Sequence, residues 1–275
     1  MHPLQYRAAV AAALKEDLSL GDVTSDSIFS NETGRGFIVA RSTGVPCGLP
    51  VAAEVFSQVD PGLVFTARFQ DGEEIKAGDC LAELAGPVAS ILKGERTALN
   101  FLQRLSGTAT ATRAAVKAVE GTGARITDTR KTTPGLRVLE KYAVRTGGGQ
   151  NHRFNLGDMV LIKDNHIRGA GSIGEAVSRA RAGVGFPVKI EVEAATLADV
   201  HEALKWGVDV VMLDNMETGL MAEAVKLVDG RALVEASGGI TQERLRKVAD
   251  AGVNLISLGY LTHSCPSLDI SLNLK

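Results

Sequence analysis

The 275-residue sequence is poor in cysteine, in aromatic side chains and in net charge. Its three cysteines, Cys47, Cys80 and Cys265, are widely spaced and form no CxxC pair. This spacing argues against a disulfide framework or a zinc site and favours reduced thiols in the cytoplasm. Thirty Lys and Arg stand against 32 Asp and Glu, so the formal net charge of −2 excludes a strongly basic nucleic-acid-binding chain. No apolar run approaches the roughly 18 residues of a membrane-spanning helix, so we expect no membrane partner.

Aromatic residues make up only 4% of the chain, whereas hydrophobic residues make up 45%. The core must therefore be built from Ala, Val, Leu and Ile, which suits layers of helices and parallel strands. Charged residues at 23% complete the composition of an ordinary globular protein and exclude a disordered chain.

The first hundred residues are mixed. A helix is predicted over residues 6–17, and strand-like runs at 36–40, 64–69 and 80–84 are separated by Gly and Pro. This pattern predicts a small unit with an antiparallel sheet. Residues 91–119 have helical periodicity, and Ser106-Gly107 predicts a break there between two helices.

After Gly123 the pattern changes to apolar strands that alternate with helices, which predicts a parallel sheet. The strands are expected at residues 124–127, 159–162, 188–192, 208–213, 232–236 and 255–258. Polar strand ends recur at Glu193, Asp214, Ser237 and Gly259, at intervals of 21, 23 and 22 residues. This repeat favours an α/β barrel with its active site at the carboxyl ends of the strands, and six visible units indicate an incomplete barrel.

An open, doubly wound sheet is the alternative fold. It would need a Gly-rich phosphate-binding turn after its first strand, and Asp128-Thr129-Arg130-Lys131 is not such a turn. Residues 268–272 alternate like a strand that could return to the N-terminal sheet.

Positive charge is concentrated in one segment. Residues 124–168 hold nine Lys and Arg against four Asp and Glu, whereas the rest of the chain holds 21 against 28. A cationic segment at strand ends predicts a site for a small polyanion, because Arg offers bidentate contacts and Lys a point charge to carboxylates and phosphates.

Individual residues in this segment remain ambiguous when each is taken alone. Arg130 and Lys131 could be a solvated pair, and His152 and Arg153 follow three glycines that could form a flexible loop or approach a ligand. Lys163 ends an apolar run, where it could reach solvent or act as a Schiff-base lysine.

The later strand ends carry acids and glycines. Glu193 and Asp214 could bind a divalent metal or ribose hydroxyls, and the backbone amides that follow two further strands could face a phosphate. Those two turns are Ser237-Gly238-Gly239 and Leu258-Gly259-Tyr260. The combination predicts a phosphorylated sugar, a metal and an anionic second substrate.

Over nearly its whole length the sequence resembles the quinolinate phosphoribosyltransferases, also called carboxylating nicotinate-nucleotide pyrophosphorylases. The resemblance is carried by EDLSLGDVTS, GERTALNFLQRLSGTAT, DTRKTTPGLR, EKYAVRTGGGQNHR, LGDMVLIKDNH, KIEVEA, LDNM, EASGGI and LGYLTHS.

This resemblance implies the fold and the assembly. It predicts an N-terminal α/β sandwich over residues 1–105, completed by 266–275, and a C-terminal incomplete barrel of six to seven strands over 106–265. It also implies a cytoplasmic homodimer with its active site between subunits, and leaves a higher oligomer of dimers open.

The resemblance further implies a reaction. Phosphoribosyl is transferred from phosphoribosyl pyrophosphate, with Mg²⁺, to quinolinate, and nicotinate mononucleotide, pyrophosphate and carbon dioxide are released in NAD biosynthesis. The competing hypotheses are a Schiff-base lyase at Lys163 and a phosphate-sensing barrel without catalysis.

Roles follow from the matching motifs. Arg96 resembles an arginine lent by the partner subunit, and Arg130, His152, Arg153 and Lys163 resemble a clamp for the two quinolinate carboxylates. Lys131 resembles a lysine near the pyrophosphate, and Lys163 is also our candidate proton donor. Glu193 and Asp214 resemble the carboxylates at the ribose and its magnesium. The expected phosphate and pyrophosphate contacts, with Thr129 as a further substrate contact, are Ser237, Gly238, Gly239, Leu258, Gly259, Tyr260 and His263. Tyr260 replaces an expected small residue and could narrow the phosphate pocket.

Overall fold

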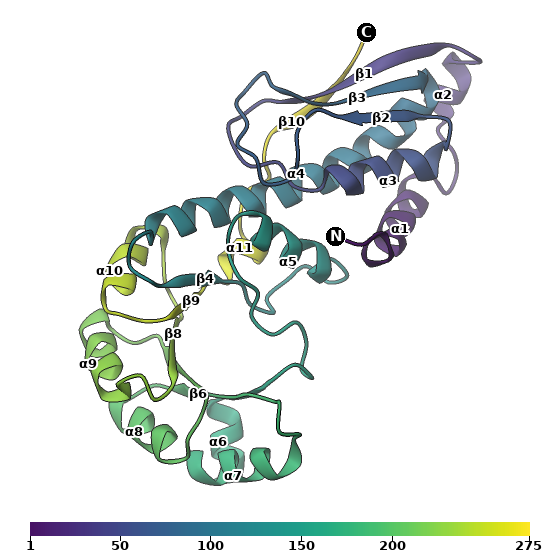
Figure 1. Ribbon diagram of the computed structural model, residues 1–275. Helices are drawn as coiled ribbons and strands as arrows, with labels where there is room; N and C mark the ends of the chain where they lie inside the picture. The colour runs from purple at the N-terminus through teal and green to yellow at the C-terminus, as the bar shows by residue number, and fades with distance from the viewer. The chain divides into compact units, whose positions relative to one another are not determined.

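The computed structural model describes residues 1–275, which group into two compact units. The first unit comprises Met1–Arg113, Thr132–Gly148 and Leu261–Lys275, and the second comprises Ala114–Lys131 and Gly149–Tyr260. Each unit combines helices with one sheet, as the mixed α/β prediction requires (Figure 1). None of the helices combines the length and the apolar character that crossing a membrane would require.

The first unit is built on a four-stranded antiparallel sheet with the order β10-β1-β3-β2. These strands are β1 (Thr33–Ala40), β2 (Val64–Ala67), β3 (Cys80–Pro87) and β10 (Ile270–Leu274). Residues 270–274, near the end of the sequence, thus pair directly with β1, with Ala40 opposite Ile270 (Figure 1).

The first unit also contains helices. They are η1 (Pro3–Gln5), α1 (Arg7–Leu18), α2 (Val23–Ile28), α3 (Leu49–Val59), α4 (Val88–Ala118), α5 (Arg137–Thr146) and α11 (Tyr260–His263). Four of them, α1, α3, α4 and α5, contribute to the core under this sheet. Val10 of α1, Phe56 of α3 and Leu102 of α4 are fully buried in one cluster with strand residues such as Ile38. Asp22, in the motif GDVTS, begins α2 because its Oδ1 accepts hydrogen bonds from the backbone amides of Thr24 and Ser25.

The predicted break at Ser106-Gly107 is wrong, because α4 is one helix of 31 residues. Gly107 serves close packing instead. A Cβ at this position would lie 2.1 Å from the carbonyl oxygen of Pro266. Ser106 also stays inside the helix, where its hydroxyl accepts a hydrogen bond from the Cys47 amide at 2.9 Å. The glycine therefore marks a chain crossing and not a helix end.

Residues 132–148 belong to the first unit, although the sequence prediction placed them in the barrel. The physical reason is α5, whose fully buried Glu140 accepts hydrogen bonds from Arg104 at 2.9 Å and from the Thr133 amide at 2.9 Å. Tyr142 donates to Asp71 at 2.8 Å. A buried carboxylate is stable only with such partners, so these contacts fix α5 against the first unit.

The second unit is built on a six-stranded parallel sheet with the order β4-β9-β8-β7-β6-β5. Its strands are β4 (Arg125–Thr127), β5 (Val160–Ile162), β6 (Ile190–Ala194), β7 (Val210–Asp214), β8 (Leu233–Ser237) and β9 (Leu255–Ser257). The connecting helices are α6 (Asp164–Ala170), α7 (Ile173–Gly183), α8 (Leu197–Lys205), α9 (Thr218–Val228), η2 (Gln242–Arg244) and α10 (Leu245–Asp250).

The strands curve with α6 to α10 along the outside of the curve (Figure 1). β4 and β5 stand at the two edges of the sheet and do not pair with each other, so the barrel is incomplete, as expected. Because all six strands run in the same direction, their carboxyl ends share one edge, where barrel active sites lie.

Candidate functional site

The carboxyl edge of the parallel sheet carries a polar residue at successive strand ends. Lys163 directly follows β5, and Asp214 and Ser237 are the last residues of β7 and β8. Glu193 lies within β6, one residue before its end, because that strand runs two residues further than its apolar pattern predicted. Asp214 and Ser237 are register partners, so their side chains emerge next to each other on the same face.

Lys163 and Glu193 form an ion pair across β5 and β6. The distance from Lys163 Nζ to Glu193 Oε2 is 2.6 Å, and the Glu193 side chain is only 15% exposed. An ammonium held by a carboxylate is not a free nucleophile, so the pair does not favour the Schiff-base lyase hypothesis. It provides instead one cation and one anion at fixed positions on the edge.

Asp214 accepts a hydrogen bond from the side chain of its neighbour Asn215 at 2.9 Å. It does not cap the following helix, since α9 begins after Glu217. Gly238 packs against the same asparagine. Its φ is +88°, and a Cβ there would lie 2.4 Å from Asn215 Oδ1, so only glycine fits between Ser237 and Gly239.

Residues that follow β4 build the other half of the edge. Thr129 accepts a hydrogen bond from the Lys131 amide at 3.0 Å, Arg130 is half-buried, and Lys131 is exposed. Asp128 is fully buried and anchors the loop that follows Gly149. Its two oxygens accept from the Asn151 side chain at 2.6 Å and from the His152 amide at 2.9 Å.

Arg153 is brought close to Arg130 by this loop. Burial and then the charge of Arg130 lower the pKa of Arg153, whereas Glu191 and Asp158 oppose the shift. The Arg153 guanidinium also donates to the Met159 carbonyl at 3.2 Å, which fixes its side chain. Two neighbouring guanidinium groups repel each other, and such a pair is stabilised by a bound anion.

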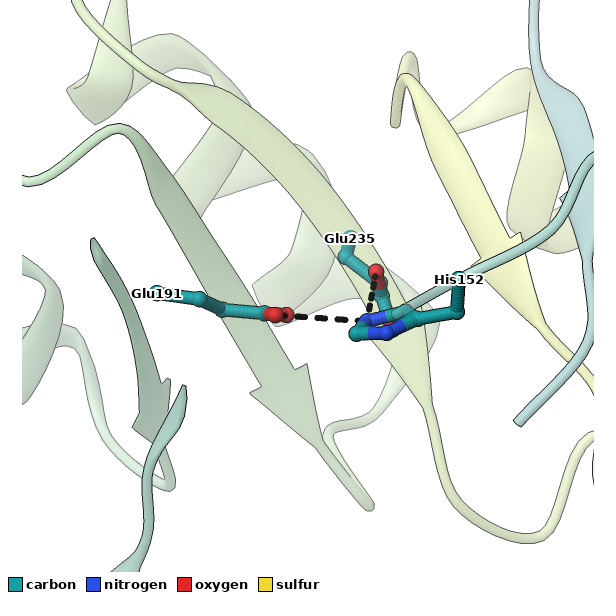
Figure 2. A group of neighbouring side chains, drawn as sticks. All are labelled: His152, Glu191 and Glu235. Atoms are coloured by element: carbon teal, nitrogen blue, oxygen red, sulfur yellow. Dashed lines mark ion pairs between the residues drawn. The ribbon is translucent and has the colours of Figure 1, made fainter. Parts of the chain in front are cut away.

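His152 is directed toward two buried acids, Glu191 of β6 and Glu235 of β8 (Figure 2). Its Nε2 lies 3.2 Å from Glu191 Oε2 and 3.3 Å from Glu235 Oε2. The other ring nitrogen, Nδ1, accepts a hydrogen bond from the Arg153 backbone amide at 2.8 Å. Both nitrogens are therefore engaged within the chain, which the assignment of His152 to the carboxylate clamp did not anticipate.

The three groups share protons. Burial opposes a charged ring, but hydrogen bonds and charges of Glu191 and Glu235 outweigh it and raise the pKa of His152 to about 10. Burial also disfavours the charged form of Glu191, which for a carboxyl group means a raised pKa. Two protonation states of the cluster have the same number of protons and the same net charge. In the first, a charged imidazolium lies between two carboxylates. In the second, the imidazole is neutral, one carboxyl is protonated and the other is ionised. Because Nδ1 accepts from Arg153, the second arrangement fits the geometry.

Sequence reasoning missed Glu191, Glu235 and Asp128. Each is at most 1% exposed and lies one or two residues before a predicted site residue, namely Thr129, Glu193 or Ser237. The available signal was an acid inside an apolar strand, as in IEVEA and VEA, since burying a carboxylate is costly unless a partner compensates.

The last strand end is less polar. Leu258 is buried and its amide donates to the Thr127 carbonyl at 3.0 Å, while Gly259 is half-buried. The Tyr260 hydroxyl donates to Gln242 at 3.0 Å. Arg96 and His263 belong to the first unit and are both exposed. Arg96 lines a cavity of about 490 Å³ in that unit, together with Glu16 and Asp17.

Comparison with known proteins gives a consistent result along the whole chain. Residues 22–106 match the family model "Quinolinate phosphoribosyl transferase, N-terminal domain", and residues 108–273 match the corresponding C-terminal domain. A "Probable nicotinate-nucleotide pyrophosphorylase (carboxylating)" from Bacillus subtilis is 48% identical over 99% of this chain and 94% of its own length. "Quinolinate phosphoribosyltransferase (decarboxylating) 1b" from Nicotiana tabacum is 38% identical over 99% of this chain and 83% of its own.

Solved structures agree with this result. NadC from Streptococcus pyogenes has a TM-score of 0.96 at 42% identity, covering 100% of this chain and 98% of its own. The nicotinate-nucleotide pyrophosphorylase from Francisella tularensis has a TM-score of 0.96 at 38% identity, with the same coverage.

Proposed function

We propose that this chain is a pentosyltransferase of NAD biosynthesis, because it belongs to the quinolinate phosphoribosyl transferase family. It transfers the phosphoribosyl group of phosphoribosyl pyrophosphate to quinolinate and releases pyrophosphate and carbon dioxide, giving nicotinate mononucleotide. Relatives that cover nearly the whole chain bear names for this activity.

The observation that supports this function best is the proximity of Arg130 and Arg153 on the sheet edge that also carries the Lys163–Glu193 ion pair. Quinolinate has two adjacent carboxylates, and the three cations at this edge, with one of their charges offset by Glu193, match that charge. A molecule with a single carboxylate would leave part of this charge uncompensated.

The chain's residues act by positioning and by charge. Arg130, Arg153 and Lys163 hold the carboxylates so that the pyridine nitrogen faces C1 of the ribose. Ser237 and the Gly238 and Gly239 amides that follow it receive the ribose phosphate, and Asp214 faces the ribose hydroxyls. As the C1–O bond to pyrophosphate breaks, negative charge grows on the leaving group, and Lys131 is an exposed cation that can stabilise it. Loss of the 2-carboxylate leaves a carbanion next to the ring cation, and Lys163 supplies the proton.

Mg²⁺ is the cofactor we propose, bound together with phosphoribosyl pyrophosphate. The hard carboxylate oxygens of Glu193 and Asp214 are the donors that this ion prefers, and it keeps several of its waters. Glu193 is already paired with Lys163 at 2.6 Å, whereas Asp214 accepts a neutral amide, so Asp214 is the better placed of the two. When bound, the ion would neutralise charge on the diphosphate.

The function is tested by incubating the purified protein with quinolinate, phosphoribosyl pyrophosphate and Mg²⁺. We expect nicotinate mononucleotide, pyrophosphate and carbon dioxide in equal amounts, measured by chromatography and by trapping of the released gas. Absence of the nucleotide, with the protein folded by circular dichroism, would disprove the assignment.

Asp214→Asn should change how the activity depends on Mg²⁺. The substitution keeps the shape of the side chain and removes its charge, so we expect weaker Mg²⁺-dependent binding of phosphoribosyl pyrophosphate and lower turnover. Quinolinate affinity should change little, because Arg130, Arg153 and Lys163 are untouched. Titration of each ligand at several Mg²⁺ concentrations measures both effects. An unchanged Mg²⁺ dependence together with near-normal turnover would show that the metal binds elsewhere.

The assembly and location are part of the same proposal. A cytoplasmic homodimer would place the exposed Arg96 of one subunit at the active site of the other, and a higher oligomer of dimers is compatible with it. The three unpaired cysteines fit a reducing compartment.

A further inference from the structure

The cluster of Glu191, His152 and Glu235 contains one predicted site residue, His152, whose Nε2 contacts these two acids. Glu191 and Glu235 are 0% and 1% exposed, and they come from β6 and β8, with β7 between them. Their carboxylate oxygens have no hydrogen-bond partner of ideal geometry, and the histidine ring lies between them (Figure 2). Two such acids would repel each other strongly without a donor between them.

The ring in turn holds the backbone of the residue that follows it. Nδ1 of His152 accepts the Arg153 amide at 2.8 Å, while Asp128 accepts the His152 amide at 2.9 Å. These contacts fix the start of the 152–153 segment from two sides. Upstream, the Gln150 amide donates to the Ile126 carbonyl at 2.8 Å, so the chain is already held to β4 at that point. The contacts of His152 extend this hold to the backbone of Arg153, whose guanidinium donates to the Met159 carbonyl.

We propose that Glu191 and Glu235 hold His152 as an anchor for Arg153, and that His152 is a positioning residue and not a direct ligand of the substrate carboxylates. The proposal rests on the proposed function, since it takes quinolinate as the anion that Arg153 binds. The role of the two buried acids is then to position the Arg153 guanidinium indirectly, through the ring of His152.

Kinetics of Glu191→Gln and Glu235→Gln test this anchor. Gln keeps the shape but weakens the hold on Nε2, so the Arg153 backbone loses one of its two anchors and its guanidinium is held only by the Met159 carbonyl. We expect kcat/KM for quinolinate to fall on the order of 10²-fold, the size of loss that a small misplacement of a binding group produces. The KM for phosphoribosyl pyrophosphate should change less than about twofold, because that ligand binds elsewhere on the edge. Glu223→Gln, an exposed acid on α9, is the matched control and should behave as wild type.

A direct role of His152 makes a different prediction. If the ring itself bound quinolinate, His152→Ala would be severe while both glutamate variants left the quinolinate KM unchanged, and that result would overturn the anchor. The anchor predicts instead that His152→Ala combined with Glu191→Gln is no worse than His152→Ala alone. It also predicts that His152→Gln, whose amide can donate to the acids, recovers part of the loss.

A measurement without substrate separates this proposal from the proposed function. Nitrogen-15 NMR of the five histidines should show one buried ring with its proton on Nε2 and an accepting Nδ1, and Glu191→Gln should perturb that signal. A ring protonated on Nδ1, or stoichiometric zinc in the purified protein that Glu191→Gln abolishes, would overturn the anchor even if the protein makes nicotinate mononucleotide. Conversely, the expected signal in a protein that does not make the nucleotide would disprove the function and leave the anchor in place.

Discussion

Nicotinate should be a poor substrate, with a kcat/KM at least about 30-fold below that of quinolinate. Nicotinate lacks the 2-carboxylate, so part of the charge of Arg130, Arg153 and Lys163 would stay unpaired in a partly buried site. Leaving one charge of such a pair unpaired costs about 2–5 kcal/mol. Steady-state kinetics with both acids at saturating phosphoribosyl pyrophosphate measure the ratio.

Arg153→Ala provides the matched test of the cause. Removing one cation should penalise quinolinate much more than nicotinate, so the ratio between the two acids should shrink. Equal efficiency of the wild-type protein on both acids would refute charge pairing as the basis of selection, as would an unchanged ratio in Arg153→Ala.

Replacing Arg96 with Ala should abolish turnover without unfolding the protein. Arg96 is exposed on α4 in the first unit, so its loss removes no buried contact, whereas the proposed role places its guanidinium at the anionic substrate of a partner subunit. We expect an unchanged melting temperature and a kcat/KM reduced at least about 30-fold, since one buried charge contact is worth about 2–5 kcal/mol. Arg7→Ala, an exposed arginine on α1, is the control.

Mixed subunits show whether Arg96 acts across an interface. When Arg96→Ala and Lys131→Ala proteins exchange subunits, each hybrid dimer has one intact site. Recovery should approach about a quarter of wild-type activity, because random exchange makes half of the dimers hybrid. No recovery after mass spectrometry has verified the exchange would mean that each site is built within one chain.

Much of the second unit is predictable from the sequence because its strands are short apolar runs with polar residues at regular intervals. That periodicity places Asp214 and Ser237 at one sheet edge, the end of an apolar run places Lys163 there, and the structure confirms these strand-end positions. Local patterns are sufficient to predict these positions, since the carboxyl ends of parallel strands all lie at the same edge of a sheet.

Other features depend on partners that are distant in sequence. Gly107 suggests a helix break from sequence alone, but in the structure it makes room for the carbonyl oxygen of Pro266. Glu140 similarly suggests a surface acid, but it is buried against Arg104. The same holds for Glu191 and Glu235, whose role becomes visible only when β6 and β8 bring them to either side of one ring. Side-chain periodicity describes which face a residue occupies, and it does not identify the residue that it meets.

The pairing of β10 with β1 has a consequence for biosynthesis. Arg41, just after β1, donates to the Ser271 hydroxyl of β10 at 2.7 Å across a separation of 230 residues. Because the ribosome delivers the chain from its N-terminus, the whole of the second unit, up to Tyr260, is made before β10 can dock. During that interval one edge of β1 has unpaired amides and carbonyls, which can attract another nascent chain. Completion of the first sheet by β10 is therefore a late event of folding, at which a chaperone would protect the exposed edge of β1.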